Sequence, residues 1–300
     1  MSASPSGSSS TRTDLVGAGG IRLAADVDGP VDGPTVVMLH GGGQTRHSWG
    51  STWRFLADNG WRAWTVDMRG HGDSEWSGDG EYELQSFADD AAAVARTIGA
   101  QTGRPPVLVG ASLGGLSSLV AIADAHPQAE LARGLVLVDV AHKLERQGTD
   151  RIGAFMTDNL DGFATLDDAA DAIAAYNPHR PRPTDLTGLA KNLRQGPDGR
   201  WRWHWDPRFV VGKFGSADET RATTVEPNLL ERSADALAVP TLLVRGRSSD
   251  LLSEDGAREF LERVPHAEFA DVAGAGHMVV GDRNEVFNAA VLEFLDRHRD

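Results

Sequence analysis

Hydrophobic residues follow two different patterns, which alternate with one another along this chain. Short continuous apolar runs, such as "PVLVG" at 106–110 and "GLVLVD" at 134–139, are typical of strands buried on both faces of a parallel sheet. Between Leu84 and Ile98 the apolar residues instead recur every three or four positions, which predicts an amphipathic helix. Strands that alternate with helices in this way indicate a doubly wound α/β sheet.

The same patterns predict eight strands in a mostly parallel sheet, with helices on both of its faces. The first two, "DLVGA" and "IRLAADV", flank Gly19 and Gly20 and are expected to form a hairpin. The remaining six strands are expected at 35–40, 62–67, 106–110, 134–139, 240–246 and 267–272. We expect helices at 47–60, 84–98 and 253–263, and a terminal helix from about residue 284.

The alternation stops after the sixth strand. Residues 141–232 carry prolines, aspartates and aromatic residues without a strong strand signal, so we expect a mostly helical cap inserted into a core formed by 14–140 and 233–300. Open α/β sheets bind ligands beyond the carboxyl ends of their strands, and a cap inserted there would cover the site. Residues 1–13, "MSASPSGSSSTRT", are expected to form a flexible tail.

Composition narrows the class of protein. The net charge of −14 argues against nucleic-acid or anionic-membrane partners, which require a basic surface. The chain has no cysteine, which excludes disulfides and thiolate catalysis. It also has no signal-like or membrane-spanning apolar segment. We therefore expect a soluble, cytoplasmic protein, and the sequence leaves its oligomeric state open. The serine chemistry considered below implies no metal or organic cofactor.

Ser112 is the candidate nucleophile. It lies in "GASLGG", between the apolar run that ends at Gly110 and a helix rich in small residues. A turn this tight brings strand and helix backbones together, so a β-carbon at Gly110 or Gly114 would clash. Such a turn holds its serine in a strained conformation at a helix N-terminus, where negative charge is favoured. The alternative is a glycine-rich turn with an incidental serine.

A glycine loop, "HGGG" at 40–43, follows the third strand and is the candidate oxyanion site. The main-chain N–H groups of Gly42 and Leu113 could together bind a tetrahedral oxyanion, with Gly43 as a substitute for Gly42. We expect His40 to brace the loop rather than to transfer protons. The alternative is an ordinary flexible loop.

The candidate acid and base follow the later strands. Asp250, in "LLVRGRSSDLLS", could orient a histidine and stabilise its imidazolium form. Its rival is Asp139, at the end of "GLVLVD"; we prefer Asp250 because Asp139 adjoins the insertion and could be occupied in holding the cap. His277, in "VAGAGHMVVGD", follows the last strand and completes the chain order serine, aspartate, histidine.

These motifs together resemble the α/β-hydrolase fold superfamily, within the capped group that includes esterases, lactonases, cofactor-free haloperoxidases, carbon–carbon hydrolases and epoxide hydrolases. The resemblance also includes "DMRGHGDS" at 67–74. In that family this stretch is chiefly structural, so Asp67, Arg69, His71 and Asp73 are read as a hydrogen-bonded brace, with a metal site as the alternative. Related epoxide hydrolases carry an aspartate nucleophile where this chain has Ser112, which favours acyl chemistry.

The cap contains "GRWRWHWDPRF" at 199–209, with tryptophans at 201, 203 and 205. In an extended segment Trp201, Trp203 and Trp205 would share one face, with Arg202 and His204 opposite. They either form an aromatic wall of the substrate pocket or pin the cap to the core, and we favour the second role.

The sequence thus predicts a serine hydrolase that cleaves a carboxylic ester or lactone of a small, largely apolar substrate. The same triad could instead hydrolyse a carbon–carbon bond or act as a cofactor-free haloperoxidase or perhydrolase. A third alternative is a ligand-binding protein that retains the fold without turnover.

Overall fold

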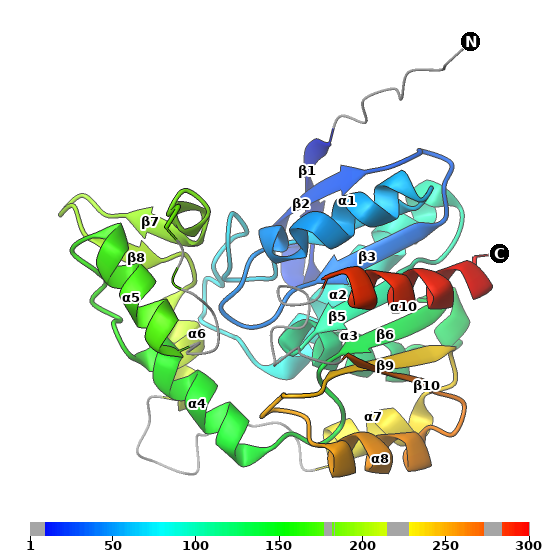
Figure 1. Cartoon of the computed structure of the whole chain (residues 1–300). Helices are drawn as coiled ribbons and strands as arrows, with labels where there is room; N and C mark the ends of the chain where they lie inside the picture. Colours follow the sequence, from blue (N-terminus) through cyan, green and yellow to red (C-terminus); the bar gives the residue numbers. More distant parts are fainter. Residues whose placement is uncertain (1–9, 177–181, 183, 215–227, 273–283, 300) are drawn as a thin grey trace.

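An eight-stranded sheet forms the centre of the molecule (Figure 1), as the apolar runs predict. The computed structural model describes residues 10–176, 182, 184–214, 228–272 and 284–299. The strand order is β1-β2-β4-β3-β5-β6-β9-β10; β1 and β2 are antiparallel to their neighbours, and the remaining strands run parallel to one another. The strands are β1 (Thr11–Val16), β2 (Arg22–Asp28), β3 (Thr35–Leu39), β4 (Arg62–Val66), β5 (Val107–Ala111), β6 (Gly134–Val138), β9 (Thr241–Gly246) and β10 (Glu268–Val272).

Helices cover both faces of this sheet. Alternate strand residues enter two separate cores: Val37 and Leu39 of β3 pack on one face, Val36 and Met38 on the other. The first face is covered by α2 (Leu84–Thr102), α3 (Leu113–Ala123), α7 (Leu229–Ala236) and α8 (Glu254–Arg263), and the second by α1 (Gly50–Asp58) and α10 (Asn284–Arg297). Short 3-10 helices lie at Ala18–Gly20, Arg46–Trp49, Gln128–Glu130 and Leu189–Asn192.

The segment after β6 forms a separate layer beside the core, in green at the left of Figure 1. It contains α4 (Arg146–Thr157), α5 (Leu166–Tyr176) and α6 (Pro207–Phe214), as expected of a mostly helical insertion. It also contains a two-stranded antiparallel sheet, β7 (Leu193–Gln195) and β8 (Trp201–Trp203). The alternating tryptophans were compatible with an extended segment at β8, but nothing in the sequence indicated β7 or the pairing of the two strands.

Two boundaries differ from the sequence expectation. The first strand begins at Thr11, which pairs with Val27, so residues 11–13 belong to the sheet and not to the tail. The core resumes before residue 233, because α7 begins at Leu229 and packs against α3.

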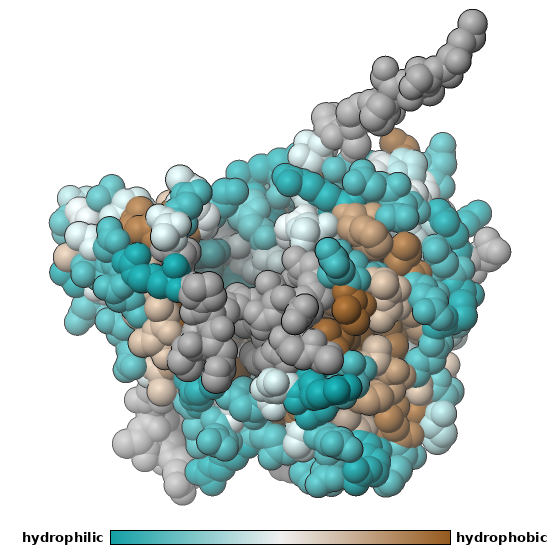
Figure 2. All heavy atoms as spheres, in the orientation of Figure 1, coloured by the Kyte–Doolittle hydropathy of each residue, from teal (hydrophilic) through white to brown (hydrophobic). Residues whose placement is uncertain are grey.

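The surface is largely hydrophilic on the face shown in Figure 2, in keeping with the net charge of −14. Hydrophobic residues gather on that face near α10 and β10, where Phe269 and Val286 are exposed. Over the described ranges, none of the helices combines the length and the apolar character needed to cross a membrane.

Candidate active site

Ser112 occupies a strained turn between β5 and α3. Its backbone angles, φ 48° and ψ −116°, lie outside the regions that ordinary side chains adopt. A β-carbon on Gly110 would lie 2.4 Å from the Gly114 carbonyl carbon, and one on Gly114 only 2.3 Å from the Leu39 oxygen. The predicted clash at both glycines is confirmed, and the turn leaves Ser112 partly exposed at the N-terminus of α3.

The glycine loop after β3 lies directly against this turn. The Gly114 N–H donates to the His40 carbonyl at 3.1 Å, which ties the two segments together. A β-carbon on Gly41 would lie 3.3 Å from Cβ of Ser112, and one on Gly42 would lie 3.9 Å from Leu113 Cδ2. None of the hydrogen bonds found among the described residues uses the N–H of Gly42 or of Leu113. Two main-chain donors are thus placed beside the serine with hydrogen-bonding capacity to spare.

Gly43 is a poorer donor than Gly42. Its N–H donates to Nε2 of the buried His71 at 3.1 Å, and Nδ1 of that ring lies 2.8 Å from the Arg69 carbonyl oxygen. The imidazole therefore holds the loop in place and engages the Gly43 N–H, which would otherwise be available as a substitute for that of Gly42. The geometry supports Gly42 as the first donor.

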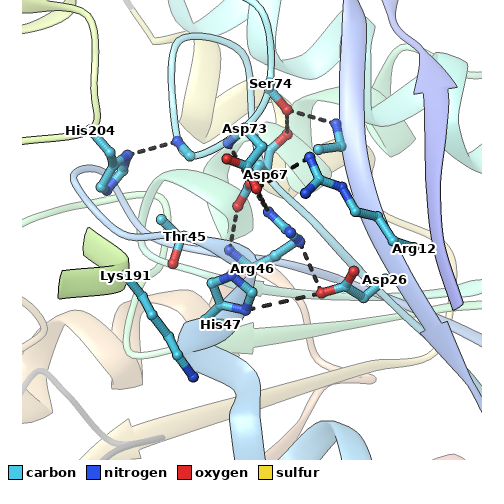
Figure 3. A network of polar contacts seen from close by, with 12 residues as sticks. Arg12, Asp26, Thr45, Arg46, His47, Asp67, Asp73, Ser74, Lys191 and His204 are labelled. Carbon is cyan, nitrogen blue, oxygen red and sulfur yellow. Dashed lines mark hydrogen bonds and ion pairs between the residues drawn. The ribbon is translucent and has the colours of Figure 1, made fainter. Parts of the chain in front are cut away.

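The "DMRGHGDS" segment is a brace, as its resemblance implied, and its centre is a residue that sequence reasoning missed. Arg46 is buried and pairs with Asp67, with Asp26 at 2.9 Å and with Asp73 at 3.0 Å (Figure 3). The Arg46 N–H also donates to Asp67 at 2.6 Å. Burial alone would raise the pKa of Asp73, but its hydrogen bond and ion pair with Arg46 lower it. Nothing in the sequence around Arg46 marks it, because its partners come from distant segments.

The buried histidines near the site are structural. Burial lowers the pKa of His40 to about 4, so the ring is neutral, and its Nε2 accepts the Met68 N–H at 3.0 Å. His204 of the cap accepts the Gly72 N–H at 2.7 Å (Figure 3), and burial lowers its pKa well below the usual value. The expected bracing role of His40 is confirmed. Over the described part of the chain, no cluster of three or more His, Asp or Glu side chains could hold a metal ion.

Cap side chains close over the glycine loop. A β-carbon on Gly42 would lie 3.4 Å from Phe209 Cζ, and one on Gly43 would lie 3.1 Å from Met156 Cε and 3.2 Å from Trp205 Cζ3. Phe209, Met156 and Trp205 are all buried, so the region beside the glycine loop is apolar. Sequence reasoning missed Met156 and Phe209, which become neighbours of the loop only through the fold.

The three tryptophans differ in role. Trp205 stacks on Trp203, with ring centroids 4.8 Å apart and planes at 10°. Both are buried, whereas Trp201 is half-buried. Trp205 also contacts the core loop at Gly43. These contacts favour the pinning role for Trp203 and Trp205.

The two candidate acids have different partners. Asp139 is buried, and its carboxylate accepts the Gly246 N–H at 2.9 Å and the Ser249 hydroxyl at 2.5 Å. Asp250 is partly exposed and pairs at 3.0 Å with Arg151 of α4. Asp250 is thus paired with a cap residue, contrary to the expectation that Asp139 would be the one to hold the cap, while these two bonds of Asp139 stay within the core.

The candidate base, His277, lies outside the described residues. The structure thus brings together Ser112, Leu113 and Gly42, and it places Asp139 and Asp250 at the ends of the two strands that follow β5 in the sheet.

Comparison with known proteins gives a consistent result. The family model described as "Alpha/beta hydrolase family" matches residues 36–290. Esterase Rv0045c of Mycobacterium tuberculosis is 30% identical over 271 residues, which cover 88% of this chain and 83% of the esterase. The bifunctional esterase/perhydrolase of Acinetobacter calcoaceticus is 25% identical over 276 residues, 89% of this chain and 93% of that protein.

A third relative is similar in both sequence and structure. The 2-(acetamidomethylene)succinate hydrolase of Mesorhizobium japonicum is 26% identical over 275 residues, 92% of each protein. A solved structure of E-2-(acetamidomethylene)succinate hydrolase superposes with a TM-score of 0.79 at 25% identity, over 96% of this chain and 99% of that one. The three relatives, which match 88–92% of the chain, are thus named as hydrolases or esterases.

Proposed function

Since the chain belongs to the alpha/beta hydrolase family, we propose that it is a serine hydrolase of carboxylic esters or lactones with Ser112 as nucleophile. The observation that carries this proposal is the strained turn at Ser112, set against a glycine loop with spare N–H donors. A resting protein maintains such strain only where surrounding contacts enforce it, and strained residues cluster at functional sites.

The proposed chemistry proceeds through an acyl-enzyme. Oγ of Ser112 attacks the substrate carbonyl carbon while its proton passes to the imidazole of His277, the base predicted from the sequence. The N–H groups of Gly42 and Leu113 stabilise the oxyanion, aided by the N-terminus of α3. The imidazolium then protonates the leaving oxygen, and a water activated by the same imidazole releases the acid and restores Ser112.

The apolar side chains around the loop favour a small, largely apolar acyl group. Met156 and Phe209 carry no charged group or hydrogen-bond donor, and Trp205 turns a carbon atom of its ring, Cζ3, toward Gly43. We therefore expect short unsubstituted acyl esters to be turned over faster than charged ones.

A serine-to-alanine pair tests the nucleophile. Ser112→Ala should lower kcat for p-nitrophenyl acetate or butyrate by about 10⁴-fold or more and leave the melting temperature within a few degrees. The matched control is Ser118→Ala in the same helix, whose buried hydroxyl only donates to the Gly114 carbonyl at 2.7 Å. Ser118→Ala should retain activity. Undiminished turnover by Ser112→Ala would reject the mechanism.

A substrate panel separates the rival reactions of the same triad. Wild-type protein is assayed with p-nitrophenyl esters, lactones, a ring-fission diketone, and acetate with hydrogen peroxide. The proposal expects ester or lactone turnover to exceed the other two activities. Faster diketone cleavage or peracid formation would instead assign a carbon–carbon hydrolase or a perhydrolase, the activity that one relative carries in its name. A complete lack of turnover and of labelling by a fluorophosphonate would favour a binding protein.

A further inference from the structure

The identity of the acid that supports the catalytic base can be decided from the neighbours of the two aspartates. In the sheet, β6 lies beside β5, the strand that leads to Ser112, whereas β9 lies one strand further away. Asp139 directly follows β6, and Asp250 lies four residues beyond the end of β9 at Gly246. The Ser112 N–H donates to the Val138 carbonyl at 3.3 Å. The main chain of Asp139 is therefore adjacent to that of the nucleophile.

The backbone of Asp139, like that of Ser112, has a positive φ. Its φ of 54° lies in the left-handed range, which few residues other than glycine adopt and which aspartate tolerates better than most. The surrounding contacts hold it there. Its N–H donates to the Val244 carbonyl at 2.7 Å, and its carboxylate accepts from the main chain of Gly246, at the end of β9, and from the side chain of Ser249 in the loop that follows. Positive φ angles directly after two adjacent strands, β5 and β6, indicate that the fold sets a particular direction for both side chains.

The carboxylate of Asp139 is held in one orientation. Oδ1 accepts the Gly246 N–H at 2.9 Å and Oδ2 accepts the Ser249 hydroxyl at 2.5 Å, so both oxygens are fixed. Both donors are neutral groups, and together they orient the carboxylate. A carboxylate held in one orientation is what an acid that orients an imidazole requires.

Asp250 is engaged elsewhere. Its carboxylate pairs at 3.0 Å with Arg151, whose guanidinium lies 4.9 Å above the ring of Tyr176 in α5. The backbone beside it is in close contact with α4, because a β-carbon on Gly148 would lie 2.4 Å from the Asp250 carbonyl oxygen. A guanidinium already neutralises this carboxylate, so it would stabilise an imidazolium less than a free carboxylate would. Its contacts connect the cap with the core.

We propose that Asp139, and not Asp250, is the positioning residue that orients the catalytic base, and that Asp250 fastens α4 of the cap to the core. This inference rests on the proposed serine-hydrolase function. The site then draws its nucleophile and its acid from neighbouring strands, β5 and β6, and the loop that follows β9 acts as a support for the acid through Gly246 and Ser249.

The test compares Asp139→Asn with Asp250→Asn, two identical changes. Asparagine has nearly the same shape as aspartate and its Oδ1 can still accept the Gly246 N–H, so the variant is expected to fold. We expect kcat/KM of Asp139→Asn for a p-nitrophenyl ester to fall by about 10³- to 10⁴-fold, and that of Asp250→Asn to stay within about threefold, as for loss of a partly exposed ion pair. Circular dichroism melting checks the folded state of both.

The pH dependence of kcat/KM separates the two roles, because it would not change if Asp139 only supported the fold. Loss of a carboxylate beside the base removes the charge that favours the imidazolium and lowers the pKa of the base. The acidic limb of kcat/KM for Asp139→Asn should therefore lie at least about one pH unit lower than for wild type, whereas that of Asp250→Asn should coincide with wild type.

Each outcome is decisive. A loss of 10²-fold or more in Asp250→Asn would overturn the assignment, and so would a folded Asp139→Asn variant that keeps a tenth of wild-type activity. If Asp139→Asn does not fold, the assignment is decided by Asp250→Asn alone. Full activity of that variant, with the acidic limb of its pH profile at the wild-type position, excludes Asp250 from the triad and supports Asp139. Failure of the proposed function appears separately, as turnover by Ser112→Ala that equals wild type.

Discussion

The glycines of the turn around Ser112 allow a quantitative test of how the site is held. Gly114 lies in the first turn of α3, where alanine would normally be the better residue by about 1 kcal/mol. Here its β-carbon would meet three main-chain atoms: the Leu39 oxygen at 2.3 Å, the Leu39 carbonyl carbon at 2.6 Å and the His40 oxygen at 2.8 Å. Main-chain atoms in a buried strand cannot rotate away as a side chain could, so α3 must move away from β3.

The expected cost follows from these contacts. Overpacking of a rigid site costs about 1–3 kcal/mol, and three close main-chain contacts place Gly114→Ala at the upper end. Displacement also weakens the 3.1 Å hydrogen bond from the Gly114 N–H to the His40 carbonyl, worth about 1 kcal/mol. After the helix-propensity gain of about 1 kcal/mol, the free energy of unfolding should fall by about 3 kcal/mol. Labelling of Ser112 by a fluorophosphonate should slow as well, because Leu113 moves with the helix.

The control is Gly99→Ala in α2, where a β-carbon would find its nearest neighbour at an ordinary 3.6 Å. This variant should gain up to about 1 kcal/mol, so the two alanine variants should differ by about 4 kcal/mol in urea unfolding followed by circular dichroism. If Gly114→Ala were as stable as Gly99→Ala, the close approach of α3 and β3 would not be what holds the serine in place.

Two further predictions concern the supports of the site. Arg46→Met leaves Asp67 and Asp73 without their buried cation, so unfolding free energy at pH 7 should fall by about 3–5 kcal/mol. Because the folded state lowers the pKa of Asp73, the stabilisation is present above the unfolded pKa of about 4 and is lost as the pH falls below it. The difference in unfolding free energy between wild type and Arg46→Met, measured in urea, should therefore shrink in acid. A difference that widens in acid would contradict this. Trp205→Ala should lower the unfolding free energy by about 3–5 kcal/mol in the same assay. Trp201→Ala, at a half-buried position, should lower it clearly less. If Trp205→Ala were as stable as wild type but had a raised KM, the aromatic-wall role would be favoured instead.

Features determined by local sequence could be predicted. The buried strands are continuous apolar runs, so their order along the chain and the insertion after β6 were evident without coordinates. The need for glycine at 110 and 114 followed from the tightness of a strand-to-helix turn, and the close contacts of both positions confirm it. These inferences required only the properties of residues near one another in sequence.

Features that depend on distant partners could not be predicted. Arg46 is indistinguishable from a surface arginine until Asp26, Asp67 and Asp73 converge on it. Strand ends identified two aspartates at the edge of the sheet, but the difference between them lies in tertiary contacts. Ser249 and Gly246 hold one, and Arg151 of the cap neutralises the other.

The most direct test of the central claim is the site of covalent modification by a fluorophosphonate. Wild-type protein is treated with the reagent, digested and mapped by tandem mass spectrometry, alongside Ser112→Ala. The account predicts one adduct, on Oγ of Ser112, formed in step with the loss of esterase activity and absent from the variant. An adduct on another residue, or inactivation without modification of Ser112, would contradict it.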